Sequence, residues 1–286
     1  MKVALATSAA LAELTEEDQL LRDSLTHRGA EVTAAVWTDP DVDWAAFDIV
    51  VIRSTWDYFE RLDEFLAWVD RVAAVTRLEN PPAYVRWNAH KEYLDELHAR
   101  GVPLVPTELV RQGSAADLGK LMRKRGWNQS VVKPAVSAGS YGTIRVSLVD
   151  AEEQQAHLDT LLAAGDVLVQ PFIESVTQGG ERSLIFIEGR YSHAVRKQAA
   201  EGDFRVQPQF GGIITADQPP QKIRDMARSI LEFAEVEPLY ARVDVVRIGE
   251  RWKLLELELI EPMLFFFADP KSVHRFADAI LHRASR

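Results

Sequence analysis

The sequence contains no cysteine, few histidines and no long apolar run. Without cysteine, the chain cannot form a disulfide, a thiolate nucleophile, a cysteine-ligated zinc site or an iron–sulfur cluster. Its seven histidines are scattered and never show H-x-x-x-H spacing, so the pattern does not favour a histidine metal site. The longest apolar run, residues 263–268, is far shorter than the roughly 20 residues of a membrane-spanning helix. We therefore expect no association with a membrane.

Positive charge is also scarce. The 286 residues include 33 Lys and Arg against 43 Asp and Glu, which gives a formal net charge of −10, and no block of basic residues occurs. Such a chain is a poor match for nucleic acid or an anionic membrane. Hydrophobic residues make up 47% and charged residues 27%, which is typical of a globular protein. At about 100–200 residues per domain, the length predicts two or three structural units.

The first residues have some features of a short signal peptide. Residues 3–12 are largely apolar, but Thr7 and Ser8 interrupt them and Glu13, Glu16 and further acidic residues follow at once. A first strand that leads into a loop and a helix explains this pattern better. We therefore expect the protein to be cytoplasmic.

Three short runs of β-branched and aliphatic residues predict strands at residues 3–6, 32–37 and 48–53. Helical patterns follow the first and the third of these runs. Almost continuously apolar strands that alternate with helices are typical of a parallel sheet covered on both faces. Residues 1–85 are therefore predicted to form a small Rossmann-like unit, although the dinucleotide-binding sequence G-x-G-x-x-G is absent.

A different organisation follows the Asn-Pro-Pro break at residues 80–82. Residues 86–170 combine short strands with helices and predict a compact α+β unit. Residues 171–286 predict antiparallel strands, an amphipathic helix, a hairpin at 241–260 and a final helix. The overall class is therefore α/β in the first unit and α+β in the other two.

The hairpin near the C-terminus carries acidic residues on both of its strands. Side chains alternate along a strand, so Glu256 and Glu258 share one face. A loop at residues 249–251 would place Asp244 opposite Glu256 and bring three carboxylates together. Like charges opposite each other destabilise a sheet, whereas Mg²⁺ binds one or two carboxylates together with phosphate oxygens. Taken alone, the hairpin fits a metal site and a solvated edge strand equally well.

Two lysines stand where a bound phosphate would be a favourable neighbour. A helix predicted from Asn88 to about residue 100 places Lys91 in its first turn, where a cation opposes the helix dipole by about 0.3–1 kcal/mol. A phosphate would reverse that effect, although a flexible lysine also tolerates the position. Lys133 ends a strand before a Gly/Ser loop at residues 137–143, which fits either a phosphate-binding loop or an ordinary hairpin. The P-loop sequence G-x-x-x-x-G-K-[ST] is absent.

In combination, these features resemble the ATP-grasp superfamily, and in particular its glutathione synthetase-like branch. The shared motifs, in the family's order, are Asn88-x-x-Lys91, Val-Val-Lys133-Pro before the Gly/Ser loop, Gln170-Pro-Phe-Ile, Arg242-Val-Asp244 and Glu256-Leu-Glu258. A single motif is unspecific, but five in order are specific, and the resemblance covers about residues 80–267. It implies an ATP-grasp fold, in which two α+β lobes clasp ATP and a Rossmann-like domain precedes them.

The resemblance also implies roles for individual residues. The implied ATP-binding residues are Lys91, Lys133, Ser137, Gly139, Ser140, Tyr141, Gly142, Gln170, Phe172, Ile173 and Glu174. The implied ligands of two Mg²⁺ ions, which Mn²⁺ could replace, are Asp244, Glu256 and Glu258. The cations implied to stabilise the transferred phosphoryl group are Arg205, Arg242 and Lys197.

Two segments resemble a smaller subgroup, which contains the O-ureidoserine cyclo-ligase of cycloserine biosynthesis. They are Arg-Ser-Thr-Trp-Asp-Tyr at residues 53–58 and Glu-Leu-Ile-Glu-Pro at residues 258–262. Arg53 also follows the third strand, where open parallel sheets bind ligands, and arginine binds carboxylates well. The expected substrate-binding residues are Arg53, Ser54, Thr55, Trp56, Asp57 and Glu261. An Arg53–Asp57 ion pair beside a core Trp56 is an equally favoured alternative.

The implied reaction is the ATP-dependent activation of a carboxylate. ATP phosphorylates a small amino-acid-like substrate to an acyl phosphate, and a nitrogen nucleophile captures it. Such chemistry depends on positioning and charge neutralisation and needs no protein nucleophile. The most specific prediction is the cyclisation of O-ureidoserine to cycloserine. A nucleotide-binding module without ligase activity and a glutathione synthetase-like peptide ligase are the alternatives, and a homodimer is left open.

Overall fold

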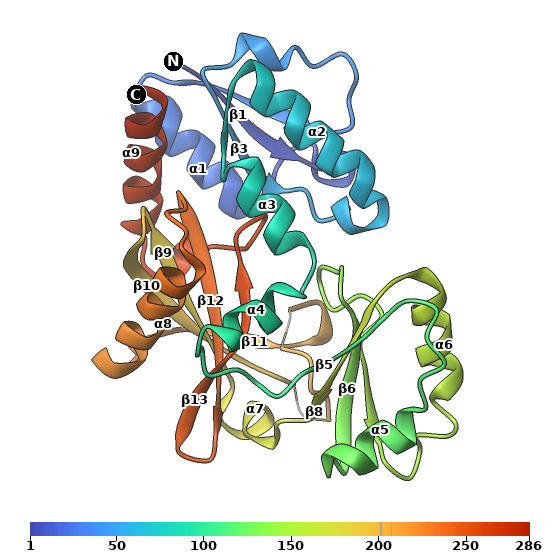
Figure 1. Ribbon diagram of the computed structural model, residues 1–286. Helices are drawn as coiled ribbons and strands as arrows, with labels where there is room; N and C mark the ends of the chain where they lie inside the picture. Colours follow the sequence, from blue (N-terminus) through green and yellow to red (C-terminus); the bar gives the residue numbers. More distant parts are fainter. Residues whose placement is uncertain (201, 207) are drawn as a thin grey trace.

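The first 80 residues form a parallel sheet. The computed structural model describes residues 1–200, 202–206 and 208–286 (Figure 1). The sheet has the order β2-β1-β3-β4, and its strands are β1 (Lys2–Thr7), β2 (Glu31–Val36), β3 (Ile49–Ser54) and β4 (Arg77–Glu79). β3 is buried along its whole length, as expected for an apolar strand between two layers of helices.

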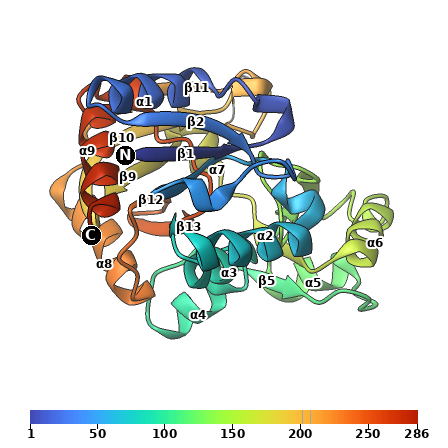
Figure 2. The same ribbon diagram turned by 90° about the horizontal axis from the view of Figure 1, so that it is seen from above.

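Helices cover both faces of this sheet. They are α1 (Glu16–His27), α2 (Leu62–Val75) and the last helix of the chain, α9 (Ser272–Ala284). Val3 and Leu5 of β1 pack in one core with α1 and α9, whereas Ala4 and Ala6 pack on the other face with α2. Figure 2 shows these helices around the sheet. The C-terminal helix therefore belongs to the same core as the N-terminal sheet, although the sequence places it in the last predicted unit.

A smaller antiparallel sheet follows and has the order β5-β8-β6-β7. Its strands are β5 (Glu108–Val110), β6 (Gln129–Pro134), β7 (Ile144–Ser147) and β8 (Val167–Pro171). Two helices, α5 (Leu118–Arg125) and α6 (Gln155–Ala164), pack on it through Leu118, Met122, Leu158 and Leu162, which share one core with the strands.

The third sheet is antiparallel and has the order β11-β10-β9-β12-β13. Its strands are β9 (Glu181–Ile187), β10 (Arg190–Gln198), β11 (Ile213–Asp217), β12 (Tyr240–Ile248) and β13 (Arg251–Glu258). Helix α7 (Glu174–Gly179) precedes β9, and α8 (Gln221–Ala234) packs through Ile223, Ala227 and Ile230 against Leu184 and Phe186 of β9. The opposite face of β9 shares the core of α1 and α9.

Two short helices, α3 (Pro82–Ala89) and α4 (Tyr93–Ala99), connect the N-terminal sheet to the lobes. The prediction of a single helix that begins at Asn88 is therefore wrong. Asn88 lies in α3 and caps nothing. Its amide donates to the Leu257 carbonyl at 2.8 Å and accepts from the Leu259 N–H at 2.8 Å. These bonds satisfy backbone groups at the C-terminal end of the outer edge of β13, beyond the point where Leu254 bonds to Pro103 and Val105. The helix breaks here, so that Lys91 lies between α3 and α4.

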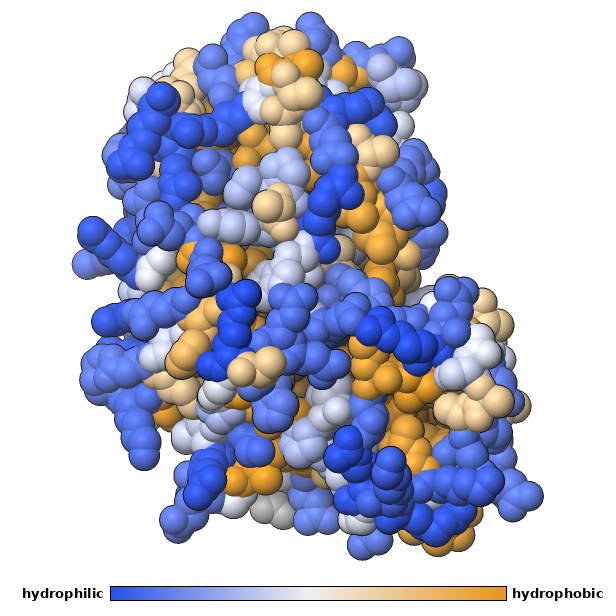
Figure 3. Space-filling view, in the orientation of Figure 1, coloured by the Kyte–Doolittle hydropathy of each residue, from blue (hydrophilic) through white to orange (hydrophobic). Residues whose placement is uncertain are grey.

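Hydrophilic side chains dominate the face of the molecule seen in Figure 3, and apolar side chains show chiefly in the hollows between them. Among the described residues, no helix has both the length and the apolar character needed to cross a membrane.

Candidate active site

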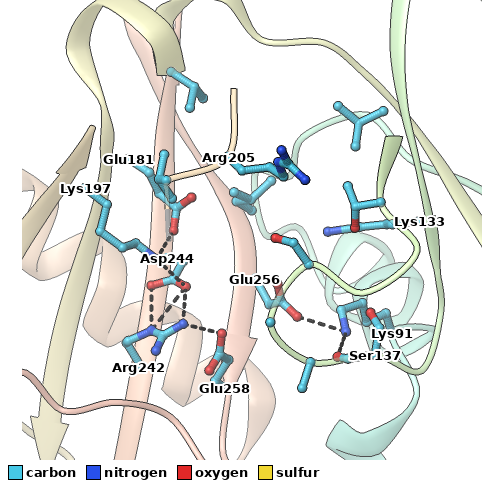
Figure 4. A pocket seen from close by; sticks show the side chains of 18 of the residues that line it. Lys91, Lys133, Ser137, Glu181, Lys197, Arg205, Arg242, Asp244, Glu256 and Glu258 are labelled. Atoms are coloured by element: carbon cyan, nitrogen blue, oxygen red, sulfur yellow. Dashed lines mark hydrogen bonds and ion pairs between the residues drawn. The ribbon is translucent and has the colours of Figure 1, made fainter. Parts of the chain in front are cut away.

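A cavity of about 360 Å³ lies where the three sheets meet, which is a volume typical of small-molecule sites. The N-terminal sheet contributes Trp56 and Tyr58 from the segment after β3. Figure 4 shows Lys91 and Lys133 on one side of the cavity and the charged residues of the large sheet on the other. Residues far apart in the sequence therefore converge on one space.

The acidic hairpin has a tighter turn than predicted. Ile248 pairs with Arg251, so the turn has two residues and the expected loop at residues 249–251 is wrong. Val245 then pairs with Leu254 and Asp244 with Glu256, which leaves Leu255 as the extra residue of a β-bulge. The bulge restores the expected pairing of Asp244 with Glu256, and both side chains line the cavity.

Protein cations neutralise most of these carboxylates. Asp244 accepts hydrogen bonds from Ser183 Oγ at 2.5 Å and from Arg242 Nη2 at 2.9 Å, and it lies 3.3 Å from Lys197 Nζ. Arg242 also pairs with Glu258, and Lys197 pairs with Glu181 (Figure 4). In the structure, arginine and lysine side chains therefore neutralise the hairpin carboxylates, so their close approach does not by itself require a metal ion.

The donor chemistry of the hairpin nevertheless fits a hard divalent cation, because carboxylate oxygens are the ligands that Mg²⁺ prefers. Within the described ranges, no three His, Cys, Asp or Glu side chains lie close enough to hold one ion together. Glu256 pairs with Lys91 and Glu258 pairs with Arg242. A metal ion would therefore share these carboxylates with Lys91 and Arg242, or compete with them.

Burial and mutual repulsion separate the pKa values of the acidic residues. Burial raises the pKa of Glu258 to about 7, and the charges of Asp244 and Glu256 add to this effect against the pull of Arg242. Burial raises the pKa of Glu261 to about 8, with Glu258 as the next contribution. Burial also disfavours the ionised form of Asp244, but Arg242 and Lys197 outweigh it and hold the pKa of Asp244 below its usual value.

The two lysines of the opposite wall differ in their partners. Lys91 Nζ lies 3.1 Å from Glu256 Oε1 and donates to the Ser137 carbonyl at 3.0 Å. Lys133 forms neither an ion pair nor a side-chain hydrogen bond with any residue that the structure describes. Burial lowers the pKa of Lys133, an effect that Glu256 opposes and the nearby Lys91 reinforces. An anion in the cavity would be a favourable partner for this lysine.

Most of the residues expected to bind ATP line the cavity. They are Lys91, Lys133, Ser137, Gly139, Ser140, Gln170, Phe172 and Ile173. Tyr141, Gly142 and Glu174 do not line it. Tyr141 is 59% exposed and its ring lies 5.0 Å from that of Phe59, while Glu174 begins α7 and faces solvent. The loop thus directs its backbone and its serines inward and its aromatic side chain outward.

All three cations expected to act on the phosphoryl group line the cavity. Arg242 and Lys197 are held by the acidic residues described above. Arg205 forms an ion pair with Asp203 at 2.8 Å, and its guanidinium lies 3.7 Å from the ring centroid of Phe210. Its side chain is therefore oriented from within its own loop (Figure 4).

Four of the six expected substrate contacts do not reach the cavity. Arg53 is only 2% exposed, and it pairs with Asp18 at 2.7 Å and with Glu17 at 3.2 Å. The alternative ion pair with Asp57 is also wrong, because Asp57 accepts from Trp37 Nε1 at 2.8 Å. α1 and α9 cover this end of β3, so a charge there needs partners inside the core.

Ser54 and Thr55 are fully buried, and Ser54 donates to Asp18 at 3.0 Å. Of the six, only Trp56 and Glu261 line the cavity.

Sequence reasoning missed two polar residues of the cavity that matter to its chemistry, Tyr58 and Glu181. Tyr58 lies two residues beyond Trp56 in a motif already singled out, so the motif itself could have pointed to it. Glu181 pairs with Lys197 across the β9–β10 ladder. The pairing of β9 with β10 sets this contact, and no local sequence pattern predicts which residues of the two strands face each other.

Two sequence-family models match the chain. Residues 100–263 match the ATP-grasp domain of prokaryotic glutathione synthetase, and residues 3–80 match the N-terminal domain of D-cycloserine synthetase DcsG. With two α+β lobes around a cavity that holds lysines and carboxylates, the chain belongs to the ATP-grasp family and is an ATP-dependent ligase. The predicted family and fold class are confirmed.

The relatives of the chain include the cycloserine biosynthesis protein DcsG of Streptomyces lavendulae, which is 38% identical over 270 residues, or 90% of each chain. The crystal structure of D-cycloserine synthetase DcsG matches with a TM-score of 0.90 and 34% identity, covering 99% of this chain and 100% of that one. D-alanine–D-alanine ligase from Bacillus anthracis complexed with ATP matches with a TM-score of 0.72 at 15% identity, over 100% and 98% of the two chains. This last likeness concerns the fold alone.

Proposed function

We propose that this ligase activates the carboxylate of an O-ureidoserine-type amino acid with ATP and closes it to cycloserine. The observation that carries the proposal is the match of residues 3–80 to the N-terminal domain of D-cycloserine synthetase. This is the part of the chain that brings Trp56 and Tyr58 to the cavity. Residues 1–85 would then bind the acceptor, while residues 86–170 and 171–286 clasp the nucleotide.

The cavity offers complementary groups to each part of ATP. Lys91 and Lys133 would hold the α- and β-phosphates, because both are lysines in a space withdrawn from water. Backbone N–H groups of the loop at residues 137–140 would cover the β- and γ-phosphates. Gln170, Phe172 and Ile173 would enclose the adenine at the junction of β8 and α7.

ATP-grasp ligases use ATP together with divalent metal ions, and we propose two Mg²⁺ for this chain. Asp244, Glu256 and Glu258 would hold them, because they line one wall of the cavity and supply only oxygen donors. The bound cations would neutralise the negative charge of the phosphates. Nucleotide phosphates would take over Lys91 from Glu256, which frees the carboxylate.

Phosphoryl transfer from ATP to the acceptor carboxylate needs cations beside the transferred group. An oxygen of the acceptor carboxylate attacks the γ-phosphorus, the bond to the β-phosphate oxygen breaks, and ADP leaves. The ureido nitrogen bound to oxygen then attacks the acyl carbon, phosphate departs with the carboxylate oxygen, and the nitrogen loses its proton. Hydrolysis removes the carbamoyl group from the ring nitrogen as carbon dioxide and ammonia, which leaves cycloserine. Arg205 and Arg242 would stabilise the transferring group, and Lys197 would support them through Asp244.

The partner of this reaction is a small amino-acid-like molecule, and we propose that it takes place in the cytoplasm, where ATP is available. The test is turnover of the purified protein with ATP, Mg²⁺ and each enantiomer of O-ureidoserine. We expect ADP release that depends on the acceptor, together with cycloserine as the product identified by mass spectrometry. No ADP with either enantiomer, under conditions in which DcsG turns over, would contradict the proposal.

A further inference from the structure

The acidic residues that line the cavity are not equally neutralised. Glu181 pairs with Lys197, Asp244 pairs with Arg242 and Lys197, and Glu258 also pairs with Arg242. Glu256 pairs with Lys91 at 3.1 Å. Glu261 lines the same cavity, but none of the described residues provides its carboxylate with an ion pair or a hydrogen bond. It is the one cavity acid in the described part of the chain that is left without a cation.

The surroundings of Glu261 come from the N-terminal unit. Its backbone carbonyl accepts a hydrogen bond from Trp56 Nε1 at 3.0 Å, which ties the segment after β13 to the segment after β3. Tyr58 lines the cavity from the same segment and is only 4% exposed. Its hydroxyl forms no hydrogen bond with any residue in the described ranges, whereas the buried hydroxyls of Tyr93 and Tyr240 both do.

The Glu261 carboxylate and the Tyr58 hydroxyl indicate which chemical groups a ligand would need at this end of the cavity. A carboxylate that lines a cavity and has no counter-ion among the described residues gains most from a cation, such as an ammonium group. A buried hydroxyl without a partner gains from a hydrogen-bond acceptor. Burial, and next the charge of Glu261, raise the pKa of Tyr58 well above its usual value, so this hydroxyl acts as a donor.

We propose that Glu261 binds the α-ammonium of the acceptor amino acid while the Tyr58 hydroxyl donates to its carboxylate. The inference rests on the proposed function, because it assigns the acceptor end of the same cavity. It assigns a ligand to the lysine and to the glutamate of the cavity that have no ion-pair partner among the described residues. Lys133 binds the anionic nucleotide, and Glu261, ionised in the complex, binds the ammonium of the acceptor. The α-carbon of an amino acid carries both an ammonium and a carboxylate. The first matches the Glu261 carboxylate and the second matches the Tyr58 hydroxyl, and both protein groups line the same cavity.

The decisive experiment compares the acceptor amino acid with the same acid lacking its α-amino group. Binding to the complex of protein, Mg²⁺ and a non-hydrolysable ATP analogue is measured by calorimetry for wild type and Glu261→Gln. We expect wild type to lose about 30-fold or more in affinity when the amino group is removed, and E261Q to lose about as much with the intact amino acid. E261Q should lose nothing further with the des-amino acid.

The controls separate this role from damage to the fold or to the nucleotide site. Glu232→Gln changes an exposed glutamate of α8 and should bind both acids like wild type. Affinity of E261Q for the ATP analogue should stay within about twofold of wild type. Equal losses for both acids would overturn the proposal, because Glu261 would then act on something other than the ammonium, and so would unchanged binding of the amino acid by E261Q.

Tyr58→Phe tests the second contact, and Tyr84→Phe is its matched control because the Tyr84 hydroxyl accepts from the Glu237 N–H outside the cavity. We expect Y58F to lower kcat/KM for the acceptor about 10-fold and to leave the affinity for the ATP analogue unchanged. Activity of Y58F equal to that of Y84F would overturn the role of the hydroxyl.

The calorimetric binding experiment does not depend on turnover. An inactive wild type that still binds the amino acid through Glu261 would contradict only the proposed reaction.

Discussion

At the scale of single residues, the charges of the cavity set its ligand requirements, and Lys133 is the clearest case. Lys133→Met keeps the unbranched stem of the side chain and removes the terminal ammonium, which has no ion-pair partner among the described residues. We expect the ligand-free variant to be at least as stable as wild type, because an uncompensated charge is gone. Its affinity for a non-hydrolysable ATP analogue should fall about 30-fold or more, as measured by calorimetry.

Lys120→Met is the control for this variant, because Lys120 is exposed and pairs with Asp117 on the surface of α5. It should bind the nucleotide as wild type does. Nucleotide affinity of K133M close to that of K120M would contradict the phosphate-binding role of Lys133.

The raised pKa of Glu261 predicts how stability changes with pH. The fold favours the protonated form of this carboxyl, whose pKa rises from about 4.5 to about 8. This contribution to stability is complete below the unfolded pKa and is lost as the pH rises through about 8. Between pH 6 and pH 9, the Tm of ligand-free wild type should therefore fall more steeply than that of E261Q. Parallel Tm curves for the two proteins, recorded by scanning calorimetry, would contradict this assignment.

At the scale of elements, the outer edge of β13 determines where Glu256 and Glu258 lie. The amide of Asn88 and the hydroxyl of Tyr93 bond to the backbone of this edge at Leu257 and Leu259. Asn88→Ala leaves the buried Leu259 N–H unsatisfied, whereas the Leu257 carbonyl keeps the Tyr93 hydroxyl as a donor. We therefore expect the substitution to lower the free energy of unfolding by about 1–3 kcal/mol. Activity should fall as well, because the carboxylates lose their backbone support.

Urea unfolding measures the first effect, and ADP release at saturating ATP measures the second. Tyr93→Phe leaves the Leu257 N–H without its acceptor and should therefore show losses of similar size. A stability of N88A within about 0.5 kcal/mol of wild type would contradict the role assigned to this edge.

The glycine loop is a second element whose position can be tested. Its Tyr141 ring packs on Phe59 of the N-terminal unit, with centroids 5.0 Å apart, and an aromatic pair of this kind contributes about 0.5–1.5 kcal/mol. Tyr141→Ala should therefore raise the KM for ATP about 2- to 10-fold, because the loop loses its support across the cavity. The Tm should stay close to that of wild type. An unchanged KM would show that the contact does not hold the loop.

Local sequence patterns predicted the elements that carry their own signals. The apolar runs of β1 and β3 and the periodicity of α8 are examples, since each follows the burial of its own side chains. The break between α3 and α4 could not be predicted from the sequence. Asn88 is a common type of helix-capping residue, but in the fold its side-chain amide bonds to the backbone at Leu257 and Leu259 instead. The pairing of Asp244 with Glu256 was right for the wrong reason, since a bulge corrected the turn.

At the scale of the whole molecule, the cavity exists only because all three sheets contribute to it. The order of motifs identified the lysines and the acidic hairpin, since each motif lies within one lobe. The sequence could not show which cation neutralises which acid, because Lys91 meets Glu256 and Lys197 meets Glu181 only after the lobes assemble. For the same reason, the prediction that Arg53 lies in the substrate site was wrong. Its ion-pair partner Asp18 and the helix α9 that buries it are distant in the sequence.

In the proposed reaction, the acceptor carboxylate receives the γ-phosphoryl group of ATP before a nitrogen displaces it as phosphate. The most direct measurement uses an acceptor amino acid whose two carboxylate oxygens are ¹⁸O and follows the released phosphate by ³¹P nuclear magnetic resonance. We expect each phosphate formed during turnover to carry one ¹⁸O atom taken from the acceptor. Phosphate free of ¹⁸O, released while product accumulates, would rule out an acyl phosphate on the acceptor.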